Sequence, residues 1–390
     1  MRAAAAGALI ALFVVACGDT TTGSVTTSSP TTTTPATTPM ATRWSCGDTH
    51  NGATALALYR VATTSPSVQM VDASNPLKPY LACTLAPAYG ARSLSMTKVA
   101  FWIGDQLGMA DLRSGAITQT ARLAATATQG AFSADGTKFA YRHYGDSDGF
   151  STHLYANGSD RTLYVQEPIG GHGGPGPSFG FFDQLAFSPD GSLLLDFNTF
   201  RPSTGPATLL VFRADGSIAF QASSAPGAIW SATGSTLYFY VPNQSGTAGE
   251  LDRLQANGRR DVVANGLQGM YWARMSPDGR SIVYNASDSS VPDCGGVPHL
   301  WSLDLSTGRA TQISSLISSS PYFVKPTVLW SDEQKLSQCG PGGPSSEDGV
   351  ILAHDLSTGK DAPVDTSLVP TDVAGSLLTW NLLDVWFAPA

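Results

Sequence analysis

The chain repeats the stretch Arg274-Met-Ser-Pro-Asp-Gly-Arg-Ser-Ile-Val-Tyr284, and this repeat decides the fold. Two further copies are Ala131-Phe-Ser-Ala-Asp-Gly-Thr-Lys-Phe-Ala-Tyr141 and Ala186-Phe-Ser-Pro-Asp-Gly-Ser-Leu-Leu-Leu-Asp196. Each copy has apolar residues on both sides of a Ser-x-Asp-Gly core. In that core, Pro fixes the φ angle of the first turn position, Asp caps the turn through its side chain, and Gly accepts a positive φ. The repeat therefore predicts pairs of strands joined by a tight hairpin turn.

Weaker copies extend the repeat over most of the chain. The motif positions are 93, 133, 188, 231, 276, 331 and 372, so the spacings are 40, 55, 43, 45, 55 and 41 residues. A four-stranded propeller blade takes about 40 to 45 residues, and two blades would then carry insertions. A second strand pair that ends in a glycine turn follows the motif, as in His299–Gly308. No window has an apolar stripe of helical period, so the sequence predicts an all-β propeller of four-stranded blades.

The number of blades depends on how the two ends of the chain meet. The C-terminal run Leu377–Phe387 supplies too few strands for a blade, so strands near the N-terminus are expected to complete it. The strand-like runs there are Ala53–Val61, Val68–Asp72 and Pro79–Leu85. This closure predicts seven blades and leaves no open sheet edge. Trp44-Ser45 resembles a further motif, so eight blades are the alternative.

The composition agrees with a folded β protein. The hydrophobic content of 42% is enough for a sizeable core, and charged residues make up only 13%, which disfavours long solvated helices. The net charge of -8 and the lack of any Lys/Arg cluster argue against nucleic acid as a partner. Phosphate binding depends on grouped cations, which this sequence does not offer.

The first residues have the pattern of an export signal. Arg2 precedes an apolar run over residues 3–16, which is shorter than the roughly 20 residues that cross a bilayer. The run ends in Val14-Val15-Ala16-Cys17-Gly18, which resembles the lipobox of bacterial lipoproteins. The resemblance implies cleavage before Cys17 and acylation of that cysteine, so residues 1–16 are expected to be a lipoprotein signal peptide. A plain secretory signal with an incidental cysteine is the alternative.

Residues 17–43 are expected to form a disordered tether. From Thr20 to Thr42 the chain is nearly all Thr, Ser, Pro, Gly and Ala, and such a segment buries too little surface to offset its ordering entropy. The propeller would then occupy residues 44–390 and contact the membrane only through the lipid on Cys17. We therefore expect an exported lipoprotein that faces the periplasm or the cell surface, on either the inner or the outer membrane.

Four cysteines remain once Cys17 is assigned to lipid. They are Cys46, Cys83, Cys294 and Cys339, an even number in an exported and therefore oxidising context, so two disulfides are expected. Of the three possible pairings we favour Cys46 with Cys83 and Cys294 with Cys339, because each pair joins neighbours along the repeat. A metal centre is not indicated, because the sequence has no CxxC motif and no close Cys/His cluster.

The repeat of hydrophobic-Ser-Pro-Asp-Gly-x-x-hydrophobic resembles the WD40-like (PD40) repeat of TolB-type β-propellers. The resemblance covers the chain from about residue 44 to residue 390. It implies a periplasmic binding or scaffolding role. The chain departs from TolB in having a lipobox and a tether where TolB has an additional α/β domain, so the partners of TolB do not carry over. Because propellers host many activities, the resemblance indicates the fold more strongly than the function.

The loops of such a propeller divide between its two faces. If the strands of a blade are numbered outward from the axis, the first-to-second and third-to-fourth turns share one face. The other connections share the second face, and the long connections of this sequence all belong to it. We therefore predict that the second face binds the partner. Its candidate residues are His143, Asp146, Asp148, His172, Ser178, Arg201, Asn243, Asp288 and Asp293.

Two local motifs on these loops could carry chemistry. Gly176-Pro-Ser-Phe-Gly180 matches the GxSxG pattern of serine hydrolases, with His172 nearby, but Pro and Gly surround Ser178 where that pattern needs a strand and a helix. Asp146 and Asp148 have the alternate spacing that calcium loops use, although the later acidic ligand of an EF-hand is missing. We therefore predict no catalytic residue and no cofactor, with calcium at the two aspartates as the open alternative.

Two functions are compatible with these patterns. The first is a monomeric, non-enzymatic envelope lipoprotein whose loop face binds a protein, peptide or glycan. The second is an exported propeller enzyme, a hydrolase or lyase, that acts at the mouth of the axis. An enzyme of this fold would bring His, Arg and carboxylates together from several blades, whereas the six His and the 22 Lys plus Arg are scattered along the chain. The sequence therefore favours the binding role.

Overall fold

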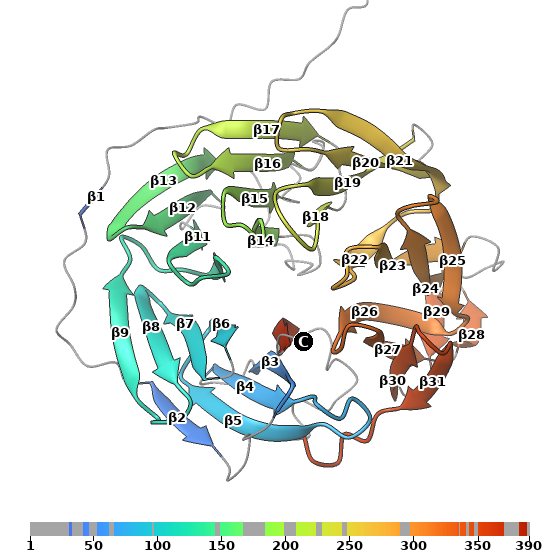
Figure 1. Cartoon of the computed structure of the whole chain (residues 1–390), viewed down its shortest axis with the longest axis horizontal. Coiled ribbons are helices and arrows are strands. Elements are labelled where there is room, and N and C mark those ends of the chain that lie inside the picture. Colours follow the sequence, from blue (N-terminus) through green and yellow to red (C-terminus); the bar gives the residue numbers. More distant parts are fainter. Residues whose placement is uncertain are drawn as a thin grey trace, which may run out of the picture.

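The structure is a computed structural model, and it describes residues 31–32, 42–46, 53–61, 66–95, 97–144, 149–166, 184–198, 208–223, 228–243, 248–288, 297–334, 336–340, 343–346, 350–369 and 382–387. Within these ranges the regular secondary structure is β-strand throughout. None of the described residues belongs to a helix of the length and hydropathy that a membrane span requires. Seven sheets of four or five strands surround a central axis, so the chain forms a seven-bladed β-propeller (Figure 1).

Blades two to seven follow one another along the chain, and in each the first strand lies nearest the axis (Figure 1). The second blade contains β6 (Gly90–Ser95), β7 (Lys98–Ile103), β8 (Gln106–Asp111) and β9 (Ile117–Arg122). The third contains β10 (Gln129–Phe132), β11 (Lys138–Tyr144), β12 (Phe150–Ala156) and β13 (Ser159–Gln166), with β1 (Thr31–Thr32) on its outer edge. The fourth contains β14 (Gln184–Phe187), β15 (Leu193–Asn198), β16 (Thr208–Arg213) and β17 (Ile218–Ser223).

The remaining blades continue the same order. The fifth contains β18 (Ala228–Trp230), β19 (Leu237–Pro242), β20 (Gly249–Leu254) and β21 (Arg260–Leu267). The sixth contains β22 (Tyr271–Met275), β23 (Ser281–Asp288), β24 (Val297–Asp304) and β25 (Arg309–Ser314). The seventh contains β26 (Ile317–Phe323), β27 (Val328–Gln334), β30 (Val350–Asp355) and β31 (Lys360–Pro363). A separate hairpin of β28 (Leu336–Gly340) and β29 (Gly343–Ser346) is inserted between its second and third strands.

The first blade closes the ring with strands from both ends of the chain. Its innermost strand is β32 (Leu382–Phe387), which pairs with β3 (Ala55–Val61), and β4 (Ser67–Asp72) and β5 (Tyr80–Ala86) follow outward. This confirms seven blades and the predicted closure. The eight-blade alternative is wrong, because Trp44 lies in β2 (Arg43–Cys46), which pairs with β5 as an outer fifth strand of the same sheet.

The Ser-x-Asp-Gly cores form the tight turns that the sequence predicts. In the third blade, the Ser133 hydroxyl donates to the Asp135 carboxylate over 2.6 Å and accepts the Lys138 amide over 3.0 Å. Asp135 also accepts the amide of Thr137 at 3.0 Å, and the glycine of the core has a φ of 69°. The Ser133 hydroxyl and the Thr137 amide lower the pKa of Asp135, because they stabilise its charged form. The same contacts recur in the fourth and sixth blades.

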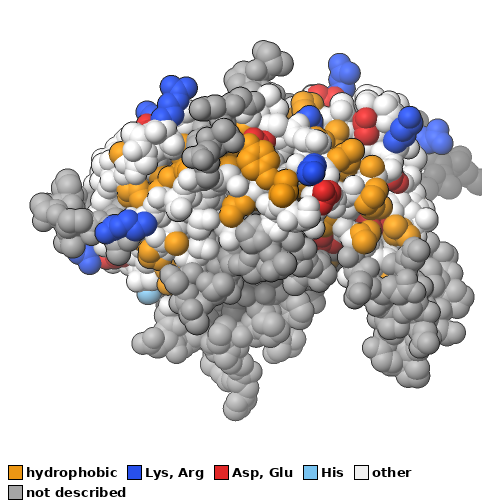
Figure 2. All heavy atoms as spheres, turned by 90° about the horizontal axis from the view of Figure 1, so that it is seen from below, with side chains coloured by type: hydrophobic (Ala, Val, Ile, Leu, Met, Phe, Trp, Pro, Cys, Tyr) orange, Lys and Arg blue, Asp and Glu red, His pale blue; other side chains and the backbone are white. Residues whose placement is uncertain are grey.

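The two rims of the disc differ because antiparallel strands return the chain to opposite ends in turn. The first-to-second and third-to-fourth connections lie on one rim, here called the short-turn rim. The second-to-third connections lie on the other, the long-loop rim, and they span residues 199–207, 289–296 and 335–349 in the fourth, sixth and seventh blades. The short turns carry exposed Arg113, Arg213 and Arg280. In the edge-on view of Figure 2, Lys and Arg side chains project mainly along the upper edge of the disc.

The apolar core lies between neighbouring blades. Trp330 of β27 is fully buried, packs against Ala57 and Val71 of the first blade, and donates its indole N–H to the Pro76 carbonyl over 2.8 Å. In the same way the indole N–H of Trp230 in the fifth blade donates to a backbone carbonyl of the fourth over 2.9 Å. Trp230 and Trp330 thus pack one blade against the next, and the indole N–H of each is hydrogen-bonded across the interface.

Candidate functional site

A cavity of about 340 Å³ lies on the propeller axis. Its walls come mainly from the innermost strands β6, β10, β14, β18, β22 and β26, which surround the axis (Figure 1). Pockets for small ligands occupy about 300 to 1,000 Å³, so this cavity is large enough for a small organic molecule.

Six of the lining residues share one register position on the innermost strands. Five of them pair with the third residue of the next strand, and Ile229 has the corresponding place in the fifth blade. Because equivalent positions of the blades lie at the same level, these residues form a ring around the axis, here called the axial ring. In chain order its members are Arg92, Ala131, Ala186, Ile229, Arg274 and Tyr322.

The axial ring has a polar side and an apolar side. The sixth, seventh and second blades contribute Arg274, Tyr322 and Arg92, with the first blade between the last two. The third, fourth and fifth blades contribute three small or apolar side chains, Ala131, Ala186 and Ile229. An amphipathic ligand on the axis would therefore meet cationic and hydroxyl groups on one side and a smooth apolar wall on the other.

Hydrogen bonds and ring stacking hold the two guanidinium groups of the axial ring. Arg92 Nη1 donates to the Phe132 carbonyl of the third blade over 3.0 Å. Arg274 Nη1 donates to the Ala273 carbonyl over 3.0 Å, and its guanidinium lies 4.5 Å from the centre of the Tyr322 ring. A guanidinium offers five N–H donors in a fixed fork, so each arginine retains donors beyond these contacts.

The electrostatics of the cavity favour an anion. Among the described lining residues there are two arginines and no Asp or Glu. Neither Arg92 nor Arg274 forms an ion pair with a described carboxylate, although the chain as a whole carries a net charge of -8. The Nε–H of Arg274 is buried and donates to no described residue. The cavity therefore concentrates positive charge on a mainly apolar wall, an arrangement that can hold an oxyanion.

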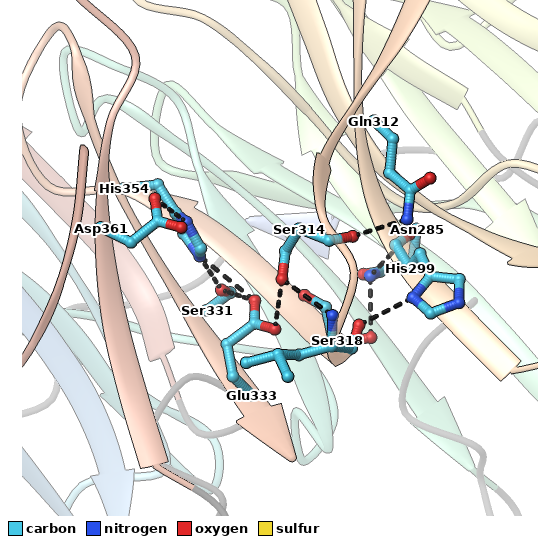
Figure 3. A network of polar contacts seen from close by, with 10 residues as sticks. Asn285, His299, Gln312, Ser314, Ser318, Ser331, Glu333, His354 and Asp361 are labelled. Carbon is cyan, nitrogen blue, oxygen red and sulfur yellow. Dashed lines mark hydrogen bonds and ion pairs between the residues drawn. The ribbon is translucent and has the colours of Figure 1, made fainter. Parts of the chain in front are cut away.

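A second polar cluster lies between the sixth and seventh blades (Figure 3). The Ser331 hydroxyl is 2.8 Å from Nε2 of His354, and Nδ1 of the same imidazole is 2.8 Å from the Asp361 carboxylate. This order of Ser, His and Asp resembles the relay of serine hydrolases. Burial lowers the pKa of His354, but hydrogen bonds and charges of Glu333 and Asp361 outweigh it and raise that pKa above its usual value.

The surroundings of Ser331 give this cluster a structural role. Ser331 is 0% exposed, and its hydroxyl donates to Glu333 over 2.6 Å. Glu333 in turn accepts the hydroxyl of Ser314 from the sixth blade over 3.0 Å (Figure 3). A nucleophile must be reached by its substrate, and the buried Ser331 hydroxyl does not meet this condition. Within the seventh blade the cluster holds the His354 imidazole between two carboxylates, and the Ser314–Glu333 hydrogen bond joins it to the sixth blade.

The structure places three of the predicted binding residues at the long-loop rim, each at or next to the end of the second strand of a different blade. His143 is near the end of β11, with Nδ1 3.0 Å from the Thr126 carbonyl. Asn243 follows β19 and is exposed, and Asp288 ends β23. The other predicted residues of this face lie outside the described residues: Asp146, Asp148, His172, Ser178, Arg201 and Asp293.

One of the two predicted disulfides is present. Cys46 of β2 and Cys83 of β5 are directly paired and bonded. Cys339 lies in β28, whereas Cys294 and the predicted lipid site Cys17 lie outside the described residues, so the second disulfide and the acylation stay predictions. In the described part of the chain, no group of three or more His, Cys, Asp and Glu side chains is arranged to hold a metal.

The arginines of the axial ring are functional candidates that the sequence analysis did not single out. A signal for one of them exists, because Arg274 stands where the copies of the motif in the third and fourth blades have Ala131 and Ala186. A cation at a position that otherwise takes alanine is unusual for an apolar strand. For Arg92 the motif copy is weak, and a bulge between Ser93 and Ser95 shifts its register by one residue.

Comparisons with known proteins identify the fold. No family model matches the sequence, and no curated protein matches it. Solved structures do match. An oligogalacturonate lyase in complex with manganese has a TM-score of 0.50 at 11% identity, with 81% of this chain and 92% of that chain covered. The β-propeller domain of the Trilobed protease from Pyrococcus furiosus has a TM-score of 0.46 at 12% identity, over 79% and 83% of the two chains. TolB from Acinetobacter baumannii has a TM-score of 0.41 at 13% identity, over 86% and 83%. At such identities the likeness concerns the β-propeller fold alone.

Proposed function

We propose that the protein is a lipid-anchored binding module of the bacterial cell envelope. Its long-loop rim would hold a protein, peptide or glycan partner, and the segment of residues 17–43, in which Thr31–Thr32 pairs with β13, would connect the propeller to the lipid on Cys17. The observation that carries the proposal is that the two rims differ, with short hydrogen-bonded turns on one and long connections on the other. In every short turn with a Ser-x-Asp-Gly core, as at Ser133, the polar side chains form hydrogen bonds within the turn itself. Few polar groups are then available to bind a partner.

The long-loop rim is the place where sequence can vary without disturbing the blades. Second-to-third connections link strands whose pairing is already complete, so their length and composition do not affect the ladder. Binding residues are commonly carried by such loops on a rigid scaffold. His143, Asn243 and Asp288 belong to this rim in three different blades.

The axial cavity favours binding over the alternative of a hydrolase or lyase at the mouth of the axis. Its described walls offer apolar, aromatic and guanidinium groups, which are groups that position a ligand. The general acid and base that an enzyme would need have to come from elsewhere. The alternative is decided by assaying the purified protein for turnover of any partner that it is found to bind.

The rim assignment is tested by capture of partners from envelope extracts with the full-length, detergent-solubilised protein. A double variant at the long-loop rim, His143→Ala with Asn243→Ala, is compared with a double variant of short-turn residues, Thr137→Ala with Ser217→Ala. We expect the captured partner to be lost with the first variant and kept with the second. Equal loss from both, or loss only from the second, would overturn the proposal.

The anchor is tested separately. In cells supplied with labelled palmitate, the wild-type chain is expected to carry the label and a Cys17→Ala variant is not. Labelling that survives this substitution would remove Cys17 as the lipid site, and absence of label from the wild type would replace the lipoprotein proposal by plain secretion.

A further inference from the structure

We propose that the axial cavity is a binding site for an organic oxyanion, a carboxylate or phosphate carried on an apolar body. The oxyanion would lie between Arg92 and Arg274 on the polar side of the axial ring, and the body would lie against the opposite wall. This inference goes beyond the partner proposed for the long-loop rim, because the residues that carry it belong to the innermost strands and to no loop.

The first argument is the charge of the two arginines. Both side chains are half-buried, and neither has a carboxylate partner among the described residues. By contrast, the buried Arg142 and the half-buried Arg253 each lie within 4.0 Å of an Asp, while Arg161 contacts backbone carbonyls. Taking a cation partly out of water without a counter-charge is unfavourable, so an anion that enters the cavity would gain the pairing that the protein does not supply.

The second argument is the geometry of the two guanidinium groups. Each is fixed by one hydrogen bond to a backbone carbonyl, and Arg274 is also stacked on Tyr322. Their orientation is therefore set before a ligand arrives, so little side-chain entropy is lost on binding. The planar fork of a guanidinium matches the paired oxygens of a carboxylate or a phosphate.

The third argument is the shape and chemistry of the opposite wall. Ala131, Ala186 and Ile229 form the apolar side of the axial ring, and Phe187 and Trp230 line the cavity beside them. The alanines leave the space that a larger side chain would occupy. Inorganic anions would bind the arginines but leave this apolar wall exposed to water, whereas an anion with an aromatic or aliphatic body would bury it. The cavity volume of about 340 Å³ suits a single ring with a short acidic arm.

The test uses the full-length protein in detergent and isothermal titration with four probes. They are 4-phenylbutyrate, its neutral amide 4-phenylbutyramide, phenyl phosphate and inorganic phosphate. We expect at least one of the two aromatic anions to bind, and to bind at least about tenfold more tightly than both the amide and inorganic phosphate. Tighter binding of 4-phenylbutyrate identifies a carboxylate as the natural group, and tighter binding of phenyl phosphate identifies a phosphate. Binding of neither anion, or equal binding of the amide, would overturn the proposal.

Three variants and one control variant locate the site. Arg92→Met and Arg274→Met are each expected to weaken the anion by at least about tenfold, while Arg280→Met at the exposed short-turn rim leaves affinity unchanged. Ala186→Leu keeps both charges and fills the apolar side, so it should also abolish binding. The fluorescence of Trp102 and Trp230, which line the cavity, gives a second readout of occupancy. Unchanged affinity in Arg274→Met and Ala186→Leu would overturn the proposal even if an anion binds.

These outcomes are separate from the fate of the rim proposal. Loss of partner capture in the His143→Ala, Asn243→Ala variant with intact anion binding would support two distinct sites. Anion binding with no captured partner would remove the rim proposal and leave the cavity site standing.

Discussion

The guanidinium of Arg142 donates to the carboxylate of Asp196, and both side chains are buried between the third and fourth blades. Gln129 and Thr152 complete the contact: Arg142 Nη1 donates to the Gln129 amide oxygen at 3.2 Å, and the Thr152 hydroxyl donates to Asp196 at 2.5 Å. The Arg142 guanidinium also lies 5.2 Å from the centre of the Phe150 ring. The ion pair lies in the same interface as an apolar cluster to which the third blade contributes Phe150 and the fourth contributes Phe187 and Phe212.

Removing one partner of this pair should cost much more than removing both. Arg142→Met leaves the Asp196 carboxylate buried without its counter-charge, and a loss of about 3–5 kcal/mol in the free energy of unfolding is expected. The double variant Arg142→Met, Asp196→Leu should recover most of this loss, because the buried charge is gone and the volume is kept. Urea unfolding of the wild type and the two variants measures the difference. A double variant as unstable as the single one would contradict this account.

The sequence predicts the fold well because each copy of the Ser-x-Asp-Gly motif is self-contained. In the third blade its turn needs only Ser133, Asp135 and Gly136, which lie together within a stretch of six residues. The motif can therefore be recognised without the rest of the chain. The closure of the ring follows from counting the strands that the motif copies leave at the two ends of the chain. The predicted strand runs near the N-terminus agree with β3 to β5 within two residues.

The axial ring could not be predicted in the same way. Which side chains meet at the axis depends on the register of six separate sheets, and one bulge near Ser93 is enough to shift it. The His354 cluster shows the same limit. Glu333 and Ser314 belong to different blades, and their contact follows from how the sixth and seventh blades pack, which no local pattern in the sequence encodes.

The disulfide between Cys46 and Cys83 should stabilise the closing blade. It links residues 37 positions apart, and a loop of that length corresponds to about 4 kcal/mol on the chain-entropy account. The double variant Cys46→Ser, Cys83→Ser is therefore expected to unfold at a lower urea concentration than the wild type when both proteins are measured without reductant. A midpoint that does not change would mean that β2 detaches without disturbing the propeller.

His354 should make the protein less stable at alkaline pH. Its pKa is raised in the fold, so the folded state holds a proton more tightly than the unfolded state. The resulting stabilisation is fully present below the unfolded pKa of about 6.5 and is lost as the pH rises through the folded pKa. Urea unfolding between neutral and alkaline pH should show this decline in the wild type. His354→Asn should be less stable at neutral pH but should lose the decline, and a slope that survives the substitution would assign it to another group.

His153 should act in the opposite direction. Burial lowers its pKa, and the opposing charge of Asp160 does not compensate, so the unfolded state takes up a proton more readily than the folded state. Stability is therefore expected to fall as the pH decreases below about 6.5. The variant His153→Asn should remove this acid-side decline and leave the alkaline one. If both histidine variants change the same side of the pH profile, the assignment of protonation states is wrong.

The motif serine Ser133 should contribute more to the free energy of unfolding than the exposed Thr137 of the same turn. Ser133 is buried, donates to Asp135 and accepts the Lys138 amide, so Ser133→Ala leaves a strand-end amide without a partner and should cost about 1–3 kcal/mol. Thr137→Val is the matched control, because its exposed hydroxyl bonds the same carboxylate and should cost below about 0.5 kcal/mol.

The pH dependence distinguishes this role from simple loss of packing. The pKa of Asp135 is lowered by the Ser133 hydroxyl, so its contribution to stability is present above the unfolded pKa of about 3.9 and is lost as the pH falls through the folded pKa. The gap in unfolding free energy between wild type and Ser133→Ala should therefore narrow in acid. A gap that stays constant from neutral pH to pH 3 would show that the hydroxyl acts through packing alone, without stabilising the carboxylate.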